Sequence, residues 1–398
     1  MNLDRLRPEL VLGAAIAAVL AVSALLSRVG SDAGWLAALG HVITVRGQVP
    51  SGVPFAAAAT GHWPNPLVLA ELIFNGLERS LGDRGLMLAQ LLCVAAALGI
   101  LARDAVRERG EPIGIAAALL LVAVGALPSL AIARVQMFSL VLFPALAALL
   151  RAETRLPSRR IWLAVPLLAL WSNLHGAALL GAGMLILYLA VERGRREPLL
   201  ALVVGVAATV ALGATPAGVH TVAYYAGVLT NQAAQRGQGL WGPLSLSSPL
   251  DVVMILAGLL VAYRAWRARP PRWEVVMGAV LIGLTIKAGR DGVWLLFFLS
   301  VPAARRLSPR RSLRTLAPLA GLAAALLLTV ALIRGPVPTG ASRSLLDGAL
   351  AAAHGSPVLA DGTIDEQVAL AGGRIWAGNP IDAFSRAVQA DYLNWLAG

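Results

Sequence analysis

Charged residues are scarce in this chain of 398 residues: they make up 14% of the sequence, whereas 58% of the residues are apolar. An average soluble protein has roughly 25% charged residues, so the composition indicates a polytopic membrane protein. Cysteine is nearly absent as well. The single Cys93 lies within an apolar run, which excludes a disulfide framework, a cysteine metal site and a thiol relay within one chain.

The sequence also lacks a Gly-rich phosphate loop and a dinucleotide-binding fingerprint. The Arg-rich segments between the apolar runs hold about ten residues each, too few for a nucleotide-binding domain. No repeat of about 20 to 50 residues and no inverted repeat of the transporter kind is evident. A soluble enzyme that uses ATP or a nucleotide sugar is therefore not expected.

What the chain does contain is a series of apolar runs suited to a hydrocarbon core of about 30 Å. We count eleven, at residues 8–28, 86–102, 113–130, 137–150, 161–175, 177–192, 198–214, 250–264, 273–287, 292–304 and 315–333. The short ones, at 137–150, 161–175, 177–192 and 292–304, predict helices that are tilted, kinked or partly buried in protein. The predicted fold is an all-α, multi-pass membrane protein with about eleven transmembrane helices.

Arginine placement orients these runs, because short cytoplasmic loops retain Lys and Arg. With the N-terminus in the cytoplasm, 21 basic and nine acidic residues fall inside, and twelve of each fall outside. The whole net charge of +12 is then on the inner side. This pattern predicts the inner (plasma) membrane with an external C-terminus, and it removes nucleic acid as an expected partner.

Most of the remaining length falls on the predicted outer side. Residues 29–85 form a long first external loop, residues 215–249 a second one, and residues 334–398 a small external tail after a transmembrane body at 1–333. Apolar spacing over residues 35–45 and 66–80 predicts interfacial helices in the first loop. We interpret the first run as an uncleaved anchor, because it is longer than a usual signal core, although Val22-Ser23-Ala24 resembles a cleavage site.

Asp32 follows the first run, where the predicted helix meets the membrane interface. A carboxylate there is accessible both to water and to a lipid-borne substrate, as a general base must be. The alternative interpretation is an aspartate that caps a helix.

Arg134 lies between two apolar runs at their predicted outer ends. A guanidinium at this depth is costly unless it is paired or binds an anion, and Arg can hold phosphate with two parallel hydrogen bonds. Three interpretations remain open: phosphate binding, an ion pair with Asp32 or Glu71, and snorkelling to the interface.

A second external charge cluster consists of Lys287, Arg290 and Asp291. Positive charge here could stabilise the negative charge that develops on a leaving group. An ordinary polar turn with a local Arg and Asp pair is the alternative.

Seven short motifs follow one another in a fixed order over residues 1–305: Asp32 to Trp35, Gly40 to Pro50, Leu69 to Glu71, Arg134 to Ser139, Trp171 to Gly176, Thr215 to Gly218, and Gly289 to Asp291. In this order they resemble bacterial integral membrane proteins of the GT-C glycosyltransferase superfamily. Most members of that superfamily use a polyprenyl-phosphate sugar as donor. The resemblance implies that Asp32, an acid of the first external loop, is the base for the acceptor.

The chain departs from the family pattern at two places in the first loop. Leu36 stands where the family often has His, and Val53-Pro54-Phe55 stands where it has Asp-Pro-Phe. Only Asp32 and Glu71 remain as plausible early ligands for a divalent metal such as Mg or Mn, so a metal cofactor is left open.

Further polar residues near these motifs are candidate substrate ligands. Amides and aromatic rings suit sugar recognition, because sugar hydroxyls form paired hydrogen bonds and sugar C–H faces pack on rings. His175 could instead link two helices, and Glu71 could be an exposed acid on an interfacial helix. The candidates are Glu71, Gln136, Asn173, His175, His220 and Tyr224.

The preferred function is transfer of a sugar, with inversion, from a polyprenyl-phosphate donor to a glycan, lipid or protein acceptor at the outer face. Asp32 would be the base, and Arg134 with Lys287 or Arg290 would hold the phosphate. Alternatives are a non-catalytic lipid or solute carrier, such as a flippase or a degenerate relative, and a lipid-linked glycan ligase or polymerase. Ionisable residues at outer helix ends, rather than at the midplane, favour an enzyme over a carrier.

Overall fold

The computed structural model describes residues 8–61, 63–307 and 317–398. Within these ranges the regular secondary structure is almost entirely helical, which confirms the all-α prediction. The one regular strand pairing is a short parallel pair, β1 (Arg28–Val29) with β2 (Ile132–Ala133).

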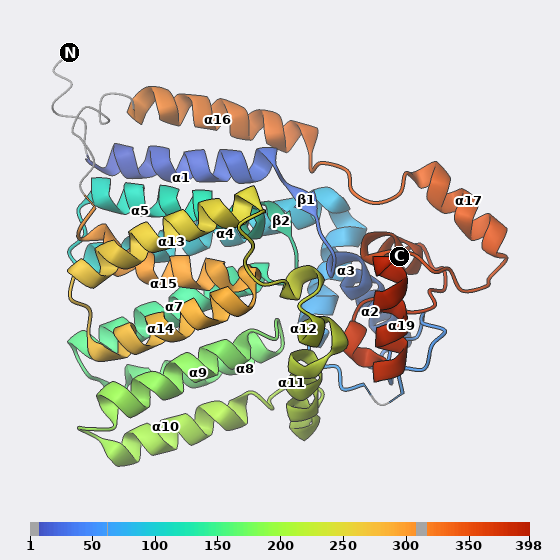
Figure 1. Cartoon of the computed structure of the whole chain (residues 1–398), viewed down its shortest axis with the longest axis horizontal. Coiled ribbons are helices and arrows are strands. Elements are labelled where there is room, and N and C mark those ends of the chain that lie inside the picture. Colours follow the sequence, from blue (N-terminus) through green and yellow to red (C-terminus); the bar gives the residue numbers. More distant parts are fainter. Residues whose placement is uncertain (1–7, 62, 308–316) are drawn as a thin grey trace.

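The main body is a bundle of helices that run side by side along one direction (Figure 1). Each apolar run predicted from the sequence coincides with one of them. They are α1 (Pro8–Leu25), α4 (Asp83–Arg107), α5 (Pro112–Gly125), α7 (Met137–Arg155), α8 (Ala164–Ser172), α9 (Ala178–Tyr188), α10 (Pro198–Ala211), α13 (Pro249–Arg267), α14 (Arg272–Lys287), α15 (Gly292–Ala304) and α16 (Ala317–Arg334).

Four helices in the described part of the chain, α4, α7, α13 and α16, are long and apolar enough to cross a membrane. The run predicted to be short at 137–150 continues to Arg155 as α7, whereas the other three short runs have identifiable structural causes. Helix α8 is preceded by the 3-10 segment η2 (Arg159–Leu163), and α9 continues into the π-helical turn η3 (Leu189–Arg193). Every residue of α15 is buried, so this helix is enclosed by protein and need not match the bilayer thickness.

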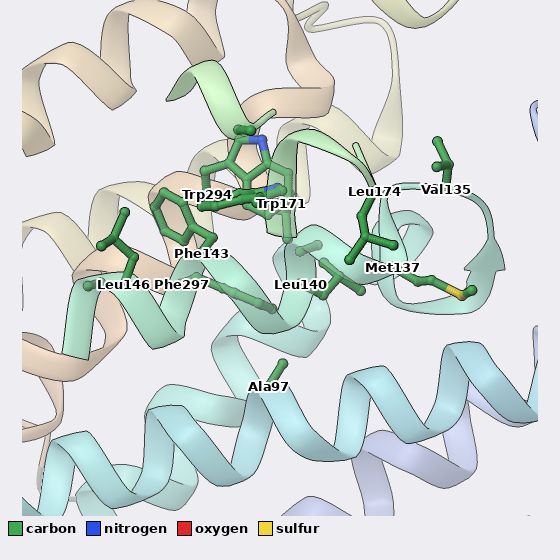
Figure 2. Packing of buried hydrophobic residues seen from close by; sticks show 14 of the residues in the cluster. Ala97, Val135, Met137, Leu140, Phe143, Leu146, Trp171, Leu174, Trp294 and Phe297 are labelled. Carbon is green, nitrogen blue, oxygen red and sulfur yellow. The ribbon is translucent and has the colours of Figure 1, made fainter. Parts of the chain in front are cut away.

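Large side chains fill the centre of the bundle around α15. Phe143 of α7 lies 5.3 Å, between ring centroids, from Trp294 of α15, and Trp171 of α8 is fully buried beside them (Figure 2). Each of these rings makes many van der Waals contacts with its neighbours, which stabilise the packing of the helices. This packing fixes α7, α8 and α15, which carry or flank several of the candidate site residues.

The three segments predicted to be external gather beyond one end of the bundle (Figure 1). The tail packs on the first loop through backbone hydrogen bonds, from Ala57 N to Ile375 O (2.8 Å) and from Ala58 N to Trp376 O (2.9 Å). These segments contain α2 (Ala33–Arg46), α3 (Val68–Leu81), η4 (Gly218–His220), α11 (Thr221–Thr230), α12 (Gln232–Arg236), η5 (Gly239–Trp241), α17 (Arg343–Ala353), α18 (Gly362–Leu370), η8 (Ile381–Ala383) and α19 (Arg386–Ala397). The connections α6 (Leu127–Ala131) and η6 (Gly289–Asp291) complete the helical elements.

Ion pairs join the helices at the opposite end. Arg151 of α7 is buried and donates to Asp104 Oδ2 of α4 (2.9 Å), to Glu274 Oε1 of α14 (2.8 Å) and to the carbonyl of Phe298 in α15 (2.7 Å). One side chain therefore holds four helices together.

Candidate functional site

A cavity of about 920 Å³ lies where the bundle meets the first loop, the second loop and the tail. Most of the predicted site residues line it, although they come from five separate stretches of the chain. The predicted residues in its wall are Asp32, Arg134, Gln136, His175, Tyr224, Lys287 and Arg290.

Asp32 occupies the N-cap position of α2 in a left-handed backbone conformation, with φ of 87°. This region is uncommon for residues other than glycine and often occurs at functional sites. The side chain makes no capping hydrogen bond to the helix. Its Oδ2 instead accepts from Arg134 Nη2 at 2.9 Å, and the carboxylate side chain is 22% exposed, so it faces both a guanidinium and the cavity.

Glu366 of the tail holds the backbone at Asp32. Its Oε1 accepts from the N–H of Asp32 (2.8 Å) and from Asn379 Nδ2 (2.9 Å), and its Oε2 accepts from the N–H of Gly34 (2.9 Å). A Cβ at Gly34 would lie 2.8 Å from Glu366 Cβ, so this approach needs glycine. Burial raises the pKa of Glu366 to about 8, the charge of Asp32 adds to the rise, and the three N–H donors oppose it.

Basic side chains line the polar end of the cavity together with the acids Asp32, Asp291 and Asp382. Arg290 stacks over the ring of Trp241, with 3.6 Å between the guanidinium carbon and the ring centroid. Burial lowers the pKa of Arg290, and the neighbouring Asp291 opposes that change. Arg134 Nε is buried and has no hydrogen-bond partner among the described residues. Together with Lys287, these groups form a site that suits an anion.

His175 both joins helices and lines the cavity. Trp171 Nε1 donates to Ser139 Oγ (2.7 Å), and the Ser139 hydroxyl lies 2.7 Å from His175 Nδ1. The N–H of Ala177 also donates to Nδ1, at 3.3 Å. Because Nδ1 accepts these bonds, the proton of the neutral ring is on Nε2, which can donate to a ligand.

The other part of the cavity is an apolar trough between α9 and α14. The wall residues recur at helical spacing, so each helix gives one stripe. Leu179 is 37% exposed and Val280 43% exposed, so the trough reaches the flank of the bundle. The stripes are Leu180, Gly183, Met184 and Leu187 of α9, and Met277, Val280 and Leu284 of α14.

Three predicted site residues lie outside this cavity. Glu71 is fully buried between α2 and α3, where Asn65 Nδ2 donates to both of its oxygens, at 2.8 and 2.9 Å. Asn173 donates from Nδ2 to the carbonyls of Ala169 (2.8 Å) and Ala214 (2.7 Å), which links α8 to the chain after α10. His220 is exposed on η4.

The tail supplies site residues to which sequence reasoning assigned no role. Asp382 lines the cavity and accepts from Trp63 Nε1 at 2.8 Å. Burial raises the pKa of Asp382 to about 6, against the effect of the Trp63 hydrogen bond. The mixture of acids, amides and aromatic rings in the tail was the available signal, but nothing local indicated that the tail folds over Asp32.

The two carboxylates expected as metal ligands do not meet in the cavity. Glu71, the second expected ligand, is engaged by Asn65 outside the cavity, and the oxygens of Glu366 already accept from three N–H groups. The described residues contain no group of three or more His, Cys, Asp or Glu arranged to hold a metal ion.

Glu71→Gln tests whether Glu71 is structural. Burial raises its pKa from 4.5 to about 8, so between these values the folded protein holds a proton that the unfolded chain has lost. The stability of the wild type relative to the variant is therefore highest below about pH 4.5 and falls as the pH rises to about 8. We measure the Tm of both proteins by thermal unfolding in detergent. As the pH rises from 5.5 to 8.5, we expect the Tm of the variant relative to that of the wild type to increase by at least about 2 °C. Equal pH profiles for both proteins would contradict the raised pKa.

No protein-family model matches the chain, and no curated protein is detectably similar to it.

Proposed function

We propose that this chain is a GT-C-type glycosyltransferase that moves a sugar from a polyprenyl-phosphate donor to an acceptor at the outer face of the inner membrane. In this proposal about eleven helices cross the membrane, the N-terminus is cytoplasmic, and the cavity end is external. The observation that carries the proposal is the shape of the cavity: a charged end at Asp32, Arg134 and Arg290 continues into an apolar trough that reaches the flank of the bundle. Such a site is complementary to an anion joined to a long hydrocarbon.

The donor would enter from the flank with its prenyl chain in the trough between α9 and α14. Its phosphate would then meet Arg134, Arg290 and Lys287, which all line the charged end. Arginine suits this task because its planar N–H groups match two phosphate oxygens at once. Trp241 fixes the guanidinium of Arg290 by stacking, so less side-chain freedom is lost when the phosphate binds.

Asp32 would remove the proton from the acceptor hydroxyl as its oxygen attacks the anomeric carbon. The bond between that carbon and the phosphate oxygen breaks, and the electron pair leaves with the phosphate. Arg134 and Arg290 stabilise the negative charge that develops. Attack on the face opposite the phosphate inverts the anomeric centre. The Nε2–H of His175, the hydroxyl of Tyr224 and the amide of Gln136 are available for the sugar hydroxyls.

The position of Arg134 supports a second task for this residue. In the structure it pairs with Asp32 at 2.9 Å, and its Nε is buried without a partner among the residues described. A bound phosphate can accept from the donors that Asp32 leaves free, so one guanidinium can bridge the base and the leaving group. The distance between acceptor and donor would then be set by one side chain.

A lipid-binding experiment distinguishes the contribution of the charged end of the cavity from that of the apolar trough. We expect the purified protein in nanodiscs to bind a short-chain polyprenyl phosphate but not the polyprenol of equal length. Arg134→Ala and Arg290→Ala should each weaken phosphate-dependent binding by about tenfold to 100-fold, because each removes charged hydrogen bonds. Arg386→Ala, which removes an exposed arginine of α19 outside the cavity, is the matched control and should bind like the wild type.

Equal binding of the phosphate and the alcohol would contradict the proposed site. If all variants bind the phosphate as the wild type does, the arginines do not hold the donor. Binding without turnover would instead favour the non-catalytic carrier, since a carrier needs the trough and the cations but not Asp32. Transfer of a preassembled glycan, rather than a single sugar, would favour the ligase or polymerase.

A further inference from the structure

A second charged cavity lies at the opposite end of the bundle, where α13 turns into α14. Its volume is about 980 Å³. Its lining is mainly basic and aromatic, with four arginines and two aromatic residues: Arg264, Arg267, Arg269, Arg306, Tyr263 and Trp266. Its described lining contains no acidic residue.

The arginines of this cavity differ from their neighbours at the same end. Arg151, Arg155, Arg193 and Arg305 each form an ion pair with an acid, mostly with Asp104, Glu108 or Glu153. The four cavity arginines form no ion pair with any acid among the described residues. Their positive charge is therefore available to a ligand.

Neutral groups hold two of these guanidiniums in place. Arg264 donates from Nη1 to the carbonyl of Arg306 at 3.0 Å, and Arg267 donates from Nη1 to the hydroxyl of Tyr263 at 3.1 Å. Both guanidinium carbons lie within 6 Å of the Tyr263 ring centroid, at 5.8 and 5.9 Å. Arg264 Nε is buried and lacks a hydrogen-bond partner in the described part of the chain. Arg264 and Arg267 are therefore held by neutral groups, and no acid in the described part of the chain neutralises their charge.

The position of the cavity indicates the kind of acceptor. Helix α13 presents an apolar flank, with Leu256 62% and Leu259 63% exposed, and this flank ends at Tyr263 and Trp266, which are 53% and 66% exposed. Exposed Tyr and Trp beside arginine, at the end of an apolar helix flank, are typical of the headgroup level of a membrane. An anion reaching this cavity from the flank would be attached to a hydrocarbon chain.

We propose that this cavity binds the phosphate headgroup of an anionic membrane phospholipid in the leaflet opposite the candidate active site. The four arginines supply the charge, Tyr263 and Trp266 contact the headgroup region, and the acyl chains lie along α13. Clusters of Lys and Arg beside a membrane-spanning helix attract anionic lipid by this chemistry. The inference does not depend on the glycosyltransferase proposal, because no residue of the first cavity takes part.

Tryptophan quenching tests this site in the full chain. The protein is placed in nanodiscs that contain brominated phosphatidylglycerol or brominated phosphatidylcholine, and the signal of Trp266 is obtained by comparison with Trp266→Phe. We expect phosphatidylglycerol to quench Trp266 at about tenfold lower mole fraction than phosphatidylcholine. The paired variant Arg264→Gln/Arg267→Gln should remove this preference.

The matched control is Arg195→Gln/Arg196→Gln, which removes two exposed arginines from the same end, outside the cavity. It should keep the preference. If it loses the preference equally, general charge rather than the cavity attracts the lipid, and the proposal is wrong. Arg269→Gln, at an exposed turn, should weaken the preference without disturbing α13 and serves if the paired variant does not fold. Equal quenching by both lipids, or loss of the preference with millimolar inorganic phosphate, would also overturn the proposal, the latter in favour of a soluble anion.

Discussion

Asp32→Asn is expected to lower the turnover of sugar transfer by about 10²–10⁴-fold, the usual contribution of a general base. Asparagine keeps the size of the side chain and tolerates the left-handed backbone conformation seen at this position. It can still accept a hydrogen bond from Arg134 through its amide oxygen, but it cannot take the proton of the acceptor. The variant should therefore retain donor binding and lose the chemical step.

Single-turnover kinetics with a polyprenyl-phosphate sugar separate these two steps. The matched control is Asp391→Asn, which changes an exposed aspartate of α19 outside the cavity and should transfer sugar like the wild type. If Asp32→Asn binds donor and turns over at the rate of the wild type, Asp32 is not the base. A loss of donor binding alone would instead give the Asp32 and Arg134 pair a purely structural role.

Arg151→Met should destabilise the protein by about 3–5 kcal/mol, because it leaves two buried carboxylates without their partner. Asp104 and Glu274 are 3% and 5% exposed, so water does not replace the lost bonds, and the carbonyl of Phe298 also loses its donor. Unfolding by SDS or by heat in detergent measures the effect. Donor binding at low temperature should persist, since this cluster lies at the end of the bundle opposite the first cavity.

Arg155→Met is the control for this prediction. Its side chain is 34% exposed, its close partner is Glu108, and it lies 4.0 Å from Asp104, which keeps Arg151 as its nearer partner, so its loss should cost at most about 1 kcal/mol. The variant Arg151→Met/Asp104→Asn/Glu274→Gln removes the unpaired charges and should recover part of the lost stability. Equal destabilisation by Arg151→Met and Arg155→Met would contradict the importance of the buried network.

The helices were predictable because hydropathy records which segments avoid water. The apolar runs and the two expected interfacial helices of the first loop all coincide with helices. The sequence predicted that the short runs are tilted, kinked or partly buried in protein, but it could not assign one of these to each run, because hydropathy does not distinguish lipid from protein as surroundings. Helix α15 reads as a short membrane span but is enclosed by protein on all sides.

The candidate site was predictable only in part, for a physical reason. The sequence indicated Asp32, Arg134 and Arg290 as candidate site residues. A charged side chain at the end of an apolar run is costly to bury unless it is paired or binds a ligand. Glu366 and Asp382 could not be assigned, since their contacts with Asp32 and Trp63 join residues more than 300 positions apart. Glu71 matched a motif, yet its burial with Asn65 depends on the packing of α2 against α3, which no local pattern reports.

The most direct test of the proposed activity is turnover by the purified wild-type protein. Polyprenyl-phosphate sugars would be supplied with acceptor candidates in nanodiscs, and release of the free polyprenyl phosphate would be followed together with the anomeric configuration of the product. We expect release that depends on Asp32 and a product of inverted configuration. Tight binding of the lipid phosphate without release, across a panel of sugars and acceptors and with Mg or Mn added, would contradict the proposed activity and leave the protein as a lipid carrier.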